Sequence, residues 1–224
     1  MTVGYAAFAT QLTINGTAGS SIYAETHKNT NSSTIKKIVD TWYQNNLTNY
    51  SSLIEDAGFC GDRSVAPSAD TWASGDTALD YGTNATYYGA ESRLDPDVGI
   101  SEAKPQFKCP QSNDLYTTSS STKGNKALTY PIGLITADEV AYAGGTFFEE
   151  NSNYYLYAQN TFLTMSPAFF DSAAAIWGVS EDGGIYYEDL SFQFDMRPFI
   201  NLKSTVEITS GDGTVKKPYF IKTN

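Results

Sequence analysis

Few side chains of this 224-residue chain could act as a nucleophile or a general base near neutral pH. The sequence holds one histidine, His27, and two cysteines, Cys60 and Cys109. A Ser-His-Asp site would have to use His27, which lies in a polar stretch before the first predicted helix. A lone histidine in such a stretch is more often solvent-exposed than catalytic. We therefore predict that the chain is not an enzyme.

The two cysteines allow two interpretations. In Phe59-Cys60-Gly-Asp62-Arg63 the guanidinium of Arg63 could activate the thiol, although Asp62 opposes that effect. The composition is typical of secreted proteins, in which an even number of cysteines commonly forms disulfides. We predict a disulfide between Cys60 and Cys109 that brackets an irregular segment, with two buried free thiols as the alternative. The single histidine and the lack of a C-x-x-C pair argue against a zinc site.

Carboxylate pairs recur along the chain and offer the oxygen ligands that calcium prefers. These pairs are Asp95/Asp97, Glu149/Glu150, Glu181/Asp182 and Glu188/Asp189. None has EF-hand spacing, and the Glu-Pro-Asn and Trp-Asn-Asp signatures of calcium-dependent lectins are missing from the sequence. We expect solvated turns, no metal site and no cofactor, with calcium binding left open as the alternative.

From Tyr154 onward, aromatic and acidic side chains sit among short apolar runs, and no His, Cys or Lys occurs between Tyr154 and Pro198. Such a stretch suits recognition of a partner better than acid–base chemistry. We predict a ligand-binding surface formed by a loop at 169–171 and a hairpin over 177–189. The predicted contact residues are Phe169, Phe170, Asp171, Trp177, Glu181, Asp182, Tyr186, Glu188, Asp189 and Phe192. Because side chains alternate along a strand, about half of them could instead be core.

The composition limits the possible partners. Aromatic residues make up 14% and charged residues 17% of the chain, a profile typical of extracellular β-rich proteins. The net charge of −11 argues against nucleic acid and against adsorption to an anionic membrane. Thr2–Ala9 is apolar over too few residues to cross a bilayer and lacks the basic region of a signal peptide. We expect that an export or anchor segment has been removed from this chain.

Apolar residues at helical spacing predict a helix that begins near Ser33 and ends at Asn45-Asn46, with a second short helix or turn over 47–54. The expected buried stripe is Ile35, Ile38, Val39, Trp42 and Tyr43. The Asn/Ser/Thr-rich residues before this helix predict a connector, preceded by an N-terminal strand.

Two short sequence patterns predict local structure more specifically. Residues 130–135 predict a buried strand, and Thr136 and Glu139 then match the Thr-x-x-Glu pattern of a capping box at a helix start. Asp182-Gly183 predicts a hairpin turn between two apolar runs, 173–179 and 185–190. A further strand-like stretch is predicted from Tyr154 to Pro167.

A last hairpin is predicted to join residues 206–209 to residues 218–221. Arg197 lies in an apolar run, so we predict that it is at least partly buried and bonded to a carboxylate or to main-chain carbonyls. Helices and strands are mixed without βαβ alternation, so the predicted class is α+β. We divide the chain into a strand and connector, residues 1–32, and one domain, residues 33–224.

Several strings resemble, in the same order, an uncharacterised domain of surface-exposed and pilin-like proteins of gut Firmicutes. They are Ser33–Leu47, Phe59–Ser64, Tyr130–Val140, Leu163–Pro167 and Arg197–Leu202. The later strings are also similar to the C-type lectin-like fold of formylglycine-generating enzymes and of the variable proteins of diversity-generating retroelements. The resemblance implies a C-type lectin-like fold with N-terminal helices and a C-terminal antiparallel, hairpin-rich sheet at the bacterial cell surface. It brings no activity, and no cysteine beyond Cys109 could support formylglycine-generating chemistry.

These observations predict an extracellular bacterial binding module, adhesin-like, that recognises a protein or glycan ligand non-covalently through its C-terminal sheet and loops. One alternative is a structural or tip subunit of a pilus-like assembly, in which the N-terminal strand, residues 3–14, pairs with a neighbouring subunit. A further alternative is a variable receptor-binding protein of a diversity-generating retroelement. We expect no nucleic-acid partner and no direct membrane insertion.

Overall fold

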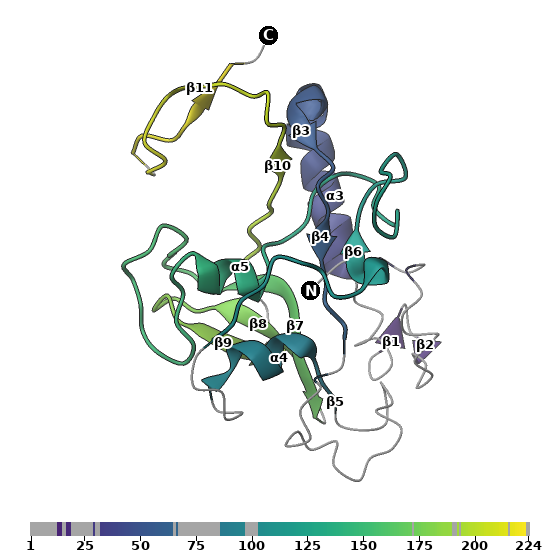
Figure 1. The fold of residues 1–224 in the computed structure, drawn as a ribbon, viewed down its shortest axis with the longest axis vertical. Coiled ribbons are helices and arrows are strands. Elements are labelled where there is room, and N and C mark those ends of the chain that lie inside the picture. The colour runs from purple at the N-terminus through teal and green to yellow at the C-terminus, as the bar shows by residue number, and fades with distance from the viewer. Residues whose placement is uncertain are drawn as a thin grey trace.

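The computed structural model describes residues 13–14, 17–18, 29, 32–64, 66, 86–96, 103–171, 173–189, 192, 194–214 and 216–222. Its largest sheet is antiparallel and has the strand order β5 (Thr86–Tyr87), β7 (Phe162–Asp171), β8 (Ala173–Val179) and β9 (Ile185–Asp189). Helices α4 (Gly89–Leu94) and α5 (Ala137–Tyr142) pack on this sheet (Figure 1). The predicted α+β class is confirmed.

A second part of the described chain stands above this sheet in Figure 1 and is built around α3 (Thr34–Asn46). Small antiparallel pairs surround the helix. They are β3 (Ile54–Glu55) with β10 (Asn201–Leu202), and β4 (Phe59–Cys60) with β6 (Leu115–Tyr116). The 3-10 helix η1 (Thr48–Leu53) joins α3 to β3, and the 3-10 helix η3 (Ser112–Asp114) leads into β6. Strand β1 (Thr13–Ile14) pairs with β2 (Thr17–Ala18). The short helix predicted over 47–54 is η1.

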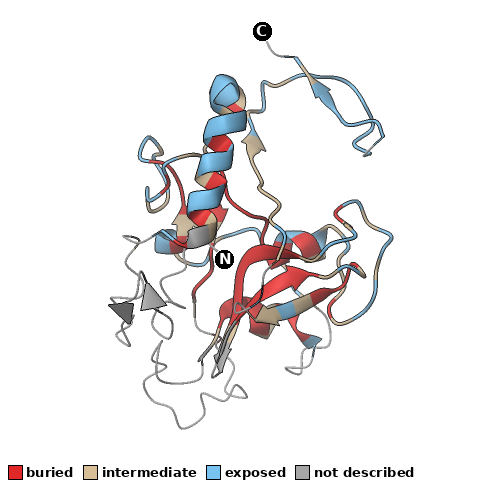
Figure 2. Ribbon diagram, turned by 180° about the vertical axis from the view of Figure 1, so that it is seen from behind, coloured by how far each residue is buried: buried red, intermediate tan, exposed pale blue. Residues whose placement is uncertain are grey.

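Strand β7 is buried along most of its length because it contributes to two hydrophobic cores (Figure 2). Phe162 and Ala168 pack with Trp177 in the core beneath α4 and α5. Met165 packs instead with Val39 and other residues around α3. The strand predicted from Tyr154 is wrong in its start, since residues 154–161 form turns and β7 begins at Phe162.

Helix α3 confirms the predicted boundaries and corrects the predicted stripe. The hydroxyl of Ser33 accepts a hydrogen bond from a main-chain N–H of the first turn and so caps the helix. Val39 and Tyr43 are buried, whereas Ile38 and Trp42 are 50% and 39% exposed. The body covers only one side of α3, so the apolar stripe is wider than the surface that buries it.

The segment before α5 is buried as predicted but is not a regular strand. Only Gly133 forms a bridge, with Phe199. The predicted capping box is confirmed: the Glu139 N–H donates to Thr136 Oγ1 at 3.1 Å, and the Thr136 N–H donates to Glu139 Oε2 at 2.8 Å. This box fixes the start of α5.

Both predicted hairpins are present. The β8–β9 turn uses Gly183, whose φ of 86° lies in the left-handed region that favours glycine. The second hairpin pairs β11 (Ile208–Ser210) with β12 (Phe220–Ile221). It projects away from the rest of the chain in both views (Figures 1 and 2).

Two predicted tertiary contacts are confirmed. Cys60 and Cys109 form a disulfide with their Cα atoms 5.5 Å apart. Arg197 is partly buried, donates to the carbonyl of Leu156 at 2.5 Å, and lies over the Phe162 ring at 4.7 Å. In the described part of the chain, no helix combines the length and the apolar character that a membrane span requires.

Candidate ligand-binding site

Trp177, which the sequence analysis predicts to contact a ligand, does not reach the surface. This side chain is fully buried and makes an edge contact with Phe147, with ring centroids 5.1 Å apart. It lies in the middle of β8, on the face that α4 and α5 cover. The prediction that Trp177 contacts a ligand is therefore wrong, because a central strand is covered on the face that carries this ring.

The other predicted residues of this hairpin are divided between the two faces of the sheet. Trp177 pairs with Tyr187 and Ala175 pairs with Asp189, so these four side chains share a face. Tyr186 and Glu188 lie on the opposite face, by the same alternation. The structure therefore does not bring Asp189 together with Tyr186 and Glu188.

Tyr186 lies beside a turn that carries carboxylates. The hydroxyl of Tyr186 donates to Asp182 Oδ2 at 3.2 Å, and Glu181 is exposed on the same turn. Desolvation and the neighbouring Asp182 raise the pKa of Tyr186. Glu188 lies two residues further along β9, where burial raises the pKa of its carboxyl.

Residues 169–171 end strand β7 and are not the loop that the sequence predicted. Phe169 is partly buried and touches the rings of Tyr87 and Tyr187, at centroid distances of 5.3 and 5.1 Å. The side chains of Phe170 and Asp171 lie outside the described residues. Phe192 is 69% exposed and its N–H donates to the carbonyl of Asp189. Contacts between rings of β5, β7 and β9 thus stand where a loop was expected.

A different surface gathers three strongly exposed aromatic side chains near an open pocket. Phe107, Tyr142 and Tyr155 are 63%, 70% and 79% exposed and line one pocket of about 510 Å³. Phe107 and Tyr142 meet edge to face with ring centroids 4.7 Å apart. The remaining lining residues are Ile135, Glu139, Ala143 and Phe199. We call this set of seven residues the aromatic pocket.

Each aromatic side chain of the pocket comes from an anchored segment. Phe107 lies between Gln106, whose N–H donates to Asp138 Oδ1 at 2.9 Å, and the disulfide of Cys109. Tyr142 ends the helix that the capping box begins. The loop of Tyr155 is tied to the end of α5 by a side-chain hydrogen bond from Asn151 to the carbonyl of Gly144 at 2.6 Å.

The residue before Tyr155 adds a further anchor for this loop. The hydroxyl of Tyr154 donates to the carbonyl of Gly183 at 2.9 Å, which ties the loop to the β8–β9 turn. Burial raises the pKa of Tyr154 to about 12, with Arg197 opposing and Asp182 adding to the shift. The protonated hydroxyl, which is the donor, is thus the stable form.

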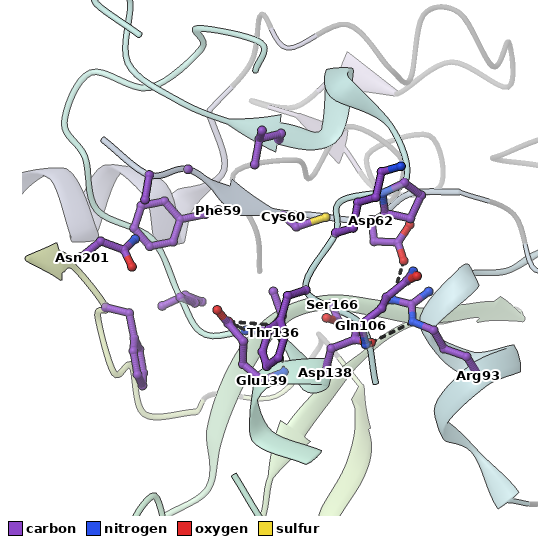
Figure 3. A pocket seen from close by; sticks show the side chains of 18 of the residues that line it. Phe59, Cys60, Asp62, Arg93, Gln106, Thr136, Asp138, Glu139, Ser166 and Asn201 are labelled. Atoms are coloured by element: carbon purple, nitrogen blue, oxygen red, sulfur yellow. Dashed lines mark hydrogen bonds and ion pairs between the residues drawn. The ribbon is translucent and has the colours of Figure 1, made fainter. Parts of the chain in front are cut away.

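Behind the aromatic pocket lies a more enclosed polar cavity of about 150 Å³ (Figure 3). It shares Phe107, Glu139 and Phe199 with the aromatic pocket. The side chains labelled around it in Figure 3 are Phe59, Cys60, Asp62, Arg93, Gln106, Thr136, Asp138, Glu139, Ser166 and Asn201. The two hollows are therefore neighbours with a common wall.

Arg93 joins two buried carboxylates in this cavity (Figure 3). Its Nε and Nη2 donate to the two oxygens of Asp138 at 2.8 and 2.7 Å, and Nη2 lies 2.6 Å from Asp62 Oδ2. Burial lowers the pKa of Arg93, but the hydrogen bond to Asp138 and the charges of Asp62 and Asp138 outweigh burial and raise it. Asp62 also accepts from the Ser64 hydroxyl. We call Asp62, Arg93 and Asp138 the carboxylate clamp.

The clamp holds together parts of the chain that surround the pocket. Asp62 follows the disulfide cysteine, Arg93 lies on α4 and Asp138 on α5. Both carboxylates engage the same guanidinium, which ties these three segments together. Among the described residues, no group of three or more His, Cys, Asp or Glu could hold a metal ion.

The sequence next to Cys60 contains Arg63, which forms a second buried ion pair. Arg63 Nε donates to Asp114 Oδ1 at 2.8 Å, and both side chains are fully buried. The Arg63 guanidinium also lies 5.7 Å from the centre of the Tyr116 ring. The alternative of a reactive thiol next to Arg63 is wrong, because Cys60 is in a disulfide and Arg63 is paired with Asp114.

The aromatic pocket was missed because its rings come from three segments with no common pattern. The rings at positions 107, 142 and 155 stand in a polar stretch, at a helix end and in a turn. The one sequence feature that pointed to this pocket was Tyr142, an aromatic residue at the end of the short helix that the capping box predicts. Comparison with known proteins adds no assignment: no family model, no curated protein and no solved structure matches this chain.

Proposed function

We propose that this chain is an extracellular binding module of a bacterial surface protein, adhesin-like, that recognises a protein or glycan ligand without covalent chemistry. The observation that carries the proposal is the exposure of Phe107, Tyr142 and Tyr155 around one open pocket. Large aromatic side chains exposed together are a common feature of recognition surfaces.

The chemistry of the aromatic pocket suits either class of ligand. Rings that are already held in place offer flat apolar surface at a small cost in conformational entropy. Glu139 adds a carboxylate at the wall, where it can meet hydroxyl groups of a glycan or a basic side chain of a protein. The capping box and the disulfide next to the pocket support pre-organisation of this surface.

The proposed location is supported by the disulfide between Cys60 and Cys109, which is typical of an oxidising extracellular environment. The proposal includes the C-type lectin-like fold that the sequence resemblance implies. The mixed architecture and the hairpin-rich C-terminal half are compatible with it. No metal or cofactor takes part in the proposed recognition.

A structural subunit of a surface assembly is the second candidate. The observation that favours it is the C-terminal hairpin, whose exposed Ile208, Tyr219 and Phe220 lie on an extension rather than on the body of the protein. The N-terminal strand predicted to pair between subunits lies mostly outside the described residues, apart from the short β1–β2 pair.

The test is binding to an array of glycans and host and bacterial surface proteins. We expect the wild-type chain to bind at least one ligand and the Tyr142→Ala/Tyr155→Ala variant to bind it roughly 100-fold more weakly, because aromatics at the centre of a site contribute most. The matched control is Tyr50→Ala, which removes an aromatic that is 46% exposed on η1.

A third variant tests the surface predicted from the sequence. Tyr186→Ala/Phe192→Ala should bind as well as the wild type if the aromatic pocket is the site. Loss of binding by this variant alone would return the site to the sheet and remove the pocket from the proposal. Full binding by every variant would contradict both.

A further inference from the structure

The C-terminal hairpin is an extension that the other described residues leave uncovered. We call residues 203–222, which contain β11 and β12, the C-terminal arm. Residues 207–214 and 216–220 are all exposed. An isolated two-stranded hairpin is marginally stable in water, so an arm of this kind is normally completed by a partner surface.

The arm carries apolar side chains toward solvent. Ile208 and Phe220 are each 59% exposed and Tyr219 is 56% exposed. The arm is tied to the body at its base, where the Lys203 N–H donates to the carbonyl of Leu53 at 2.9 Å. Among the described residues beyond this base, the hydrogen bonds of both strands run within the arm.

The internal geometry of the arm is well defined. Asp212 accepts hydrogen bonds from the N–H and hydroxyl of Thr214, and these bonds lower its pKa. Gly211 and Gly213 have φ of 96° and 81°, and the Tyr219 ring lies so close to Gly213 that a Cβ there would stand 2.7 Å from it. The turn of the arm thus has a defined conformation.

The charge of the arm is opposite to that of the rest of the chain. Four lysines and two carboxylates give residues 203–222 a net charge of +2, while the whole chain carries −11, so the remainder carries −13. Residues 127–196, which include most of the aromatic pocket, contain carboxylates and no Lys, Arg or His. The surface that complements the arm is therefore an acidic and aromatic one.

The aromatic pocket has these properties. Its lining residues include Glu139 and no basic residue, and three of its side chains are exposed rings. The arm presents Lys216-Lys-Pro-Tyr-Phe220, in which ammonium groups, a proline and two rings follow one another. Lysine over an aromatic face and aromatic against aromatic are both favourable contacts.

We propose that the C-terminal arm of one copy of this chain docks into the aromatic pocket of a second copy, in a head-to-tail arrangement. The inference rests on the proposed function, because it assigns an occupant to the same pocket. The arm and the pocket are different surfaces, so a pair of copies keeps one free arm, on one copy, and one free pocket, on the other. Such an interface closes into a ring or continues as a filament.

The experiment measures association of the full chain by sedimentation velocity, from about 1 to 500 µM, a range that spans weak protein interfaces. We expect the wild-type chain to form larger species as its concentration rises. Raising the salt from about 0.05 to 0.5 M should weaken association, because it screens the lysines of the arm. Tyr50→Ala should behave as the wild type does.

Two variants and their mixture test the arrangement. Tyr142→Ala/Tyr155→Ala removes the pocket rings, and Tyr219→Ala/Phe220→Ala removes the arm rings. Each variant alone should associate roughly 100-fold more weakly than the wild type. A mixture of the two should form a one-to-one pair that does not grow, since only one intact pocket meets one intact arm.

The outcomes separate this inference from the proposed function. A wild-type chain that stays monomeric, or variants that associate as the wild type does, would overturn arm docking while leaving ligand binding on the array untouched. A one-to-one pair from the mixture supports arm docking even if no array ligand binds. A mixture that stays monomeric while the wild type associates overturns it.

Discussion

Removal of Arg93 is expected to destabilise the fold. Arg93→Met leaves Asp62 and Asp138 without their shared cation, and these carboxylates are only 3% and 4% exposed. Breaking a buried ion pair on one side costs about 3–5 kcal/mol. Arg93 itself is 16% exposed and Asp138 keeps the N–H of Gln106, so we expect the lower end, about 3 kcal/mol near pH 7.

The measurement is urea unfolding followed by tryptophan fluorescence, to which the buried Trp177 contributes. Lys222→Met is the matched control, because it breaks an exposed ion pair with Glu207 and should cost less than about 1 kcal/mol. Arg93→Met combined with Asp62→Asn should recover part of the loss. A deficit below about 1 kcal/mol at pH 7 would refute the argument.

Three further predictions concern stability. Arg197→Met should lower the unfolding free energy by about 2 kcal/mol in urea melts, because it removes a charged donor to a main-chain carbonyl and a contact with an aromatic face; an unchanged midpoint would contradict this. Replacing Cys60 and Cys109 by Ser should cost about 4 kcal/mol, since the disulfide joins residues 49 apart, and calorimetry of the variant beside the wild type measures it. Burial raises the folded-state pKa of Tyr116 and Tyr154. The stability that these two hydroxyls contribute is therefore complete below pH 10, their pKa in the unfolded chain, and is lost as the pH rises further. Tyr116→Phe should reduce the fall in melting temperature at alkaline pH, and an equal fall in variant and wild type would count against it.

The elements that the sequence predicted well are those with a local signal. The capping box of Thr136 and Glu139 depends on residues three apart, and the turn at Asp182-Gly183 on residues next to each other. Helix α4 shows the opposite case. It has six residues, and its N-cap, Tyr88, makes no side-chain capping hydrogen bond. The sequence near α4 therefore holds no local pattern that predicts a helix.

The prediction that Trp177 is exposed failed for a physical reason that applies to every residue of the predicted surface. Alternation along β8 and β9 identifies which side chains share a face, but it does not say which face the rest of the chain covers. Here that choice depends on α4 and α5, which pack on the face of Trp177. A rich run of aromatic residues is consequently compatible with either a core or a surface.

The clamp and the aromatic pocket depend on each other in a way that the sequence could not reveal. Arg93 and Asp138 are 45 residues apart, and Asp138 also receives the N–H next to Phe107. Asp138 thus holds the segment that carries Phe107, a side chain of the proposed binding site. Exposed rings bind strongly only when little conformational freedom is lost on binding. For the proposed site, then, the buried carboxylates affect affinity by positioning the segment of Phe107, without touching the ligand.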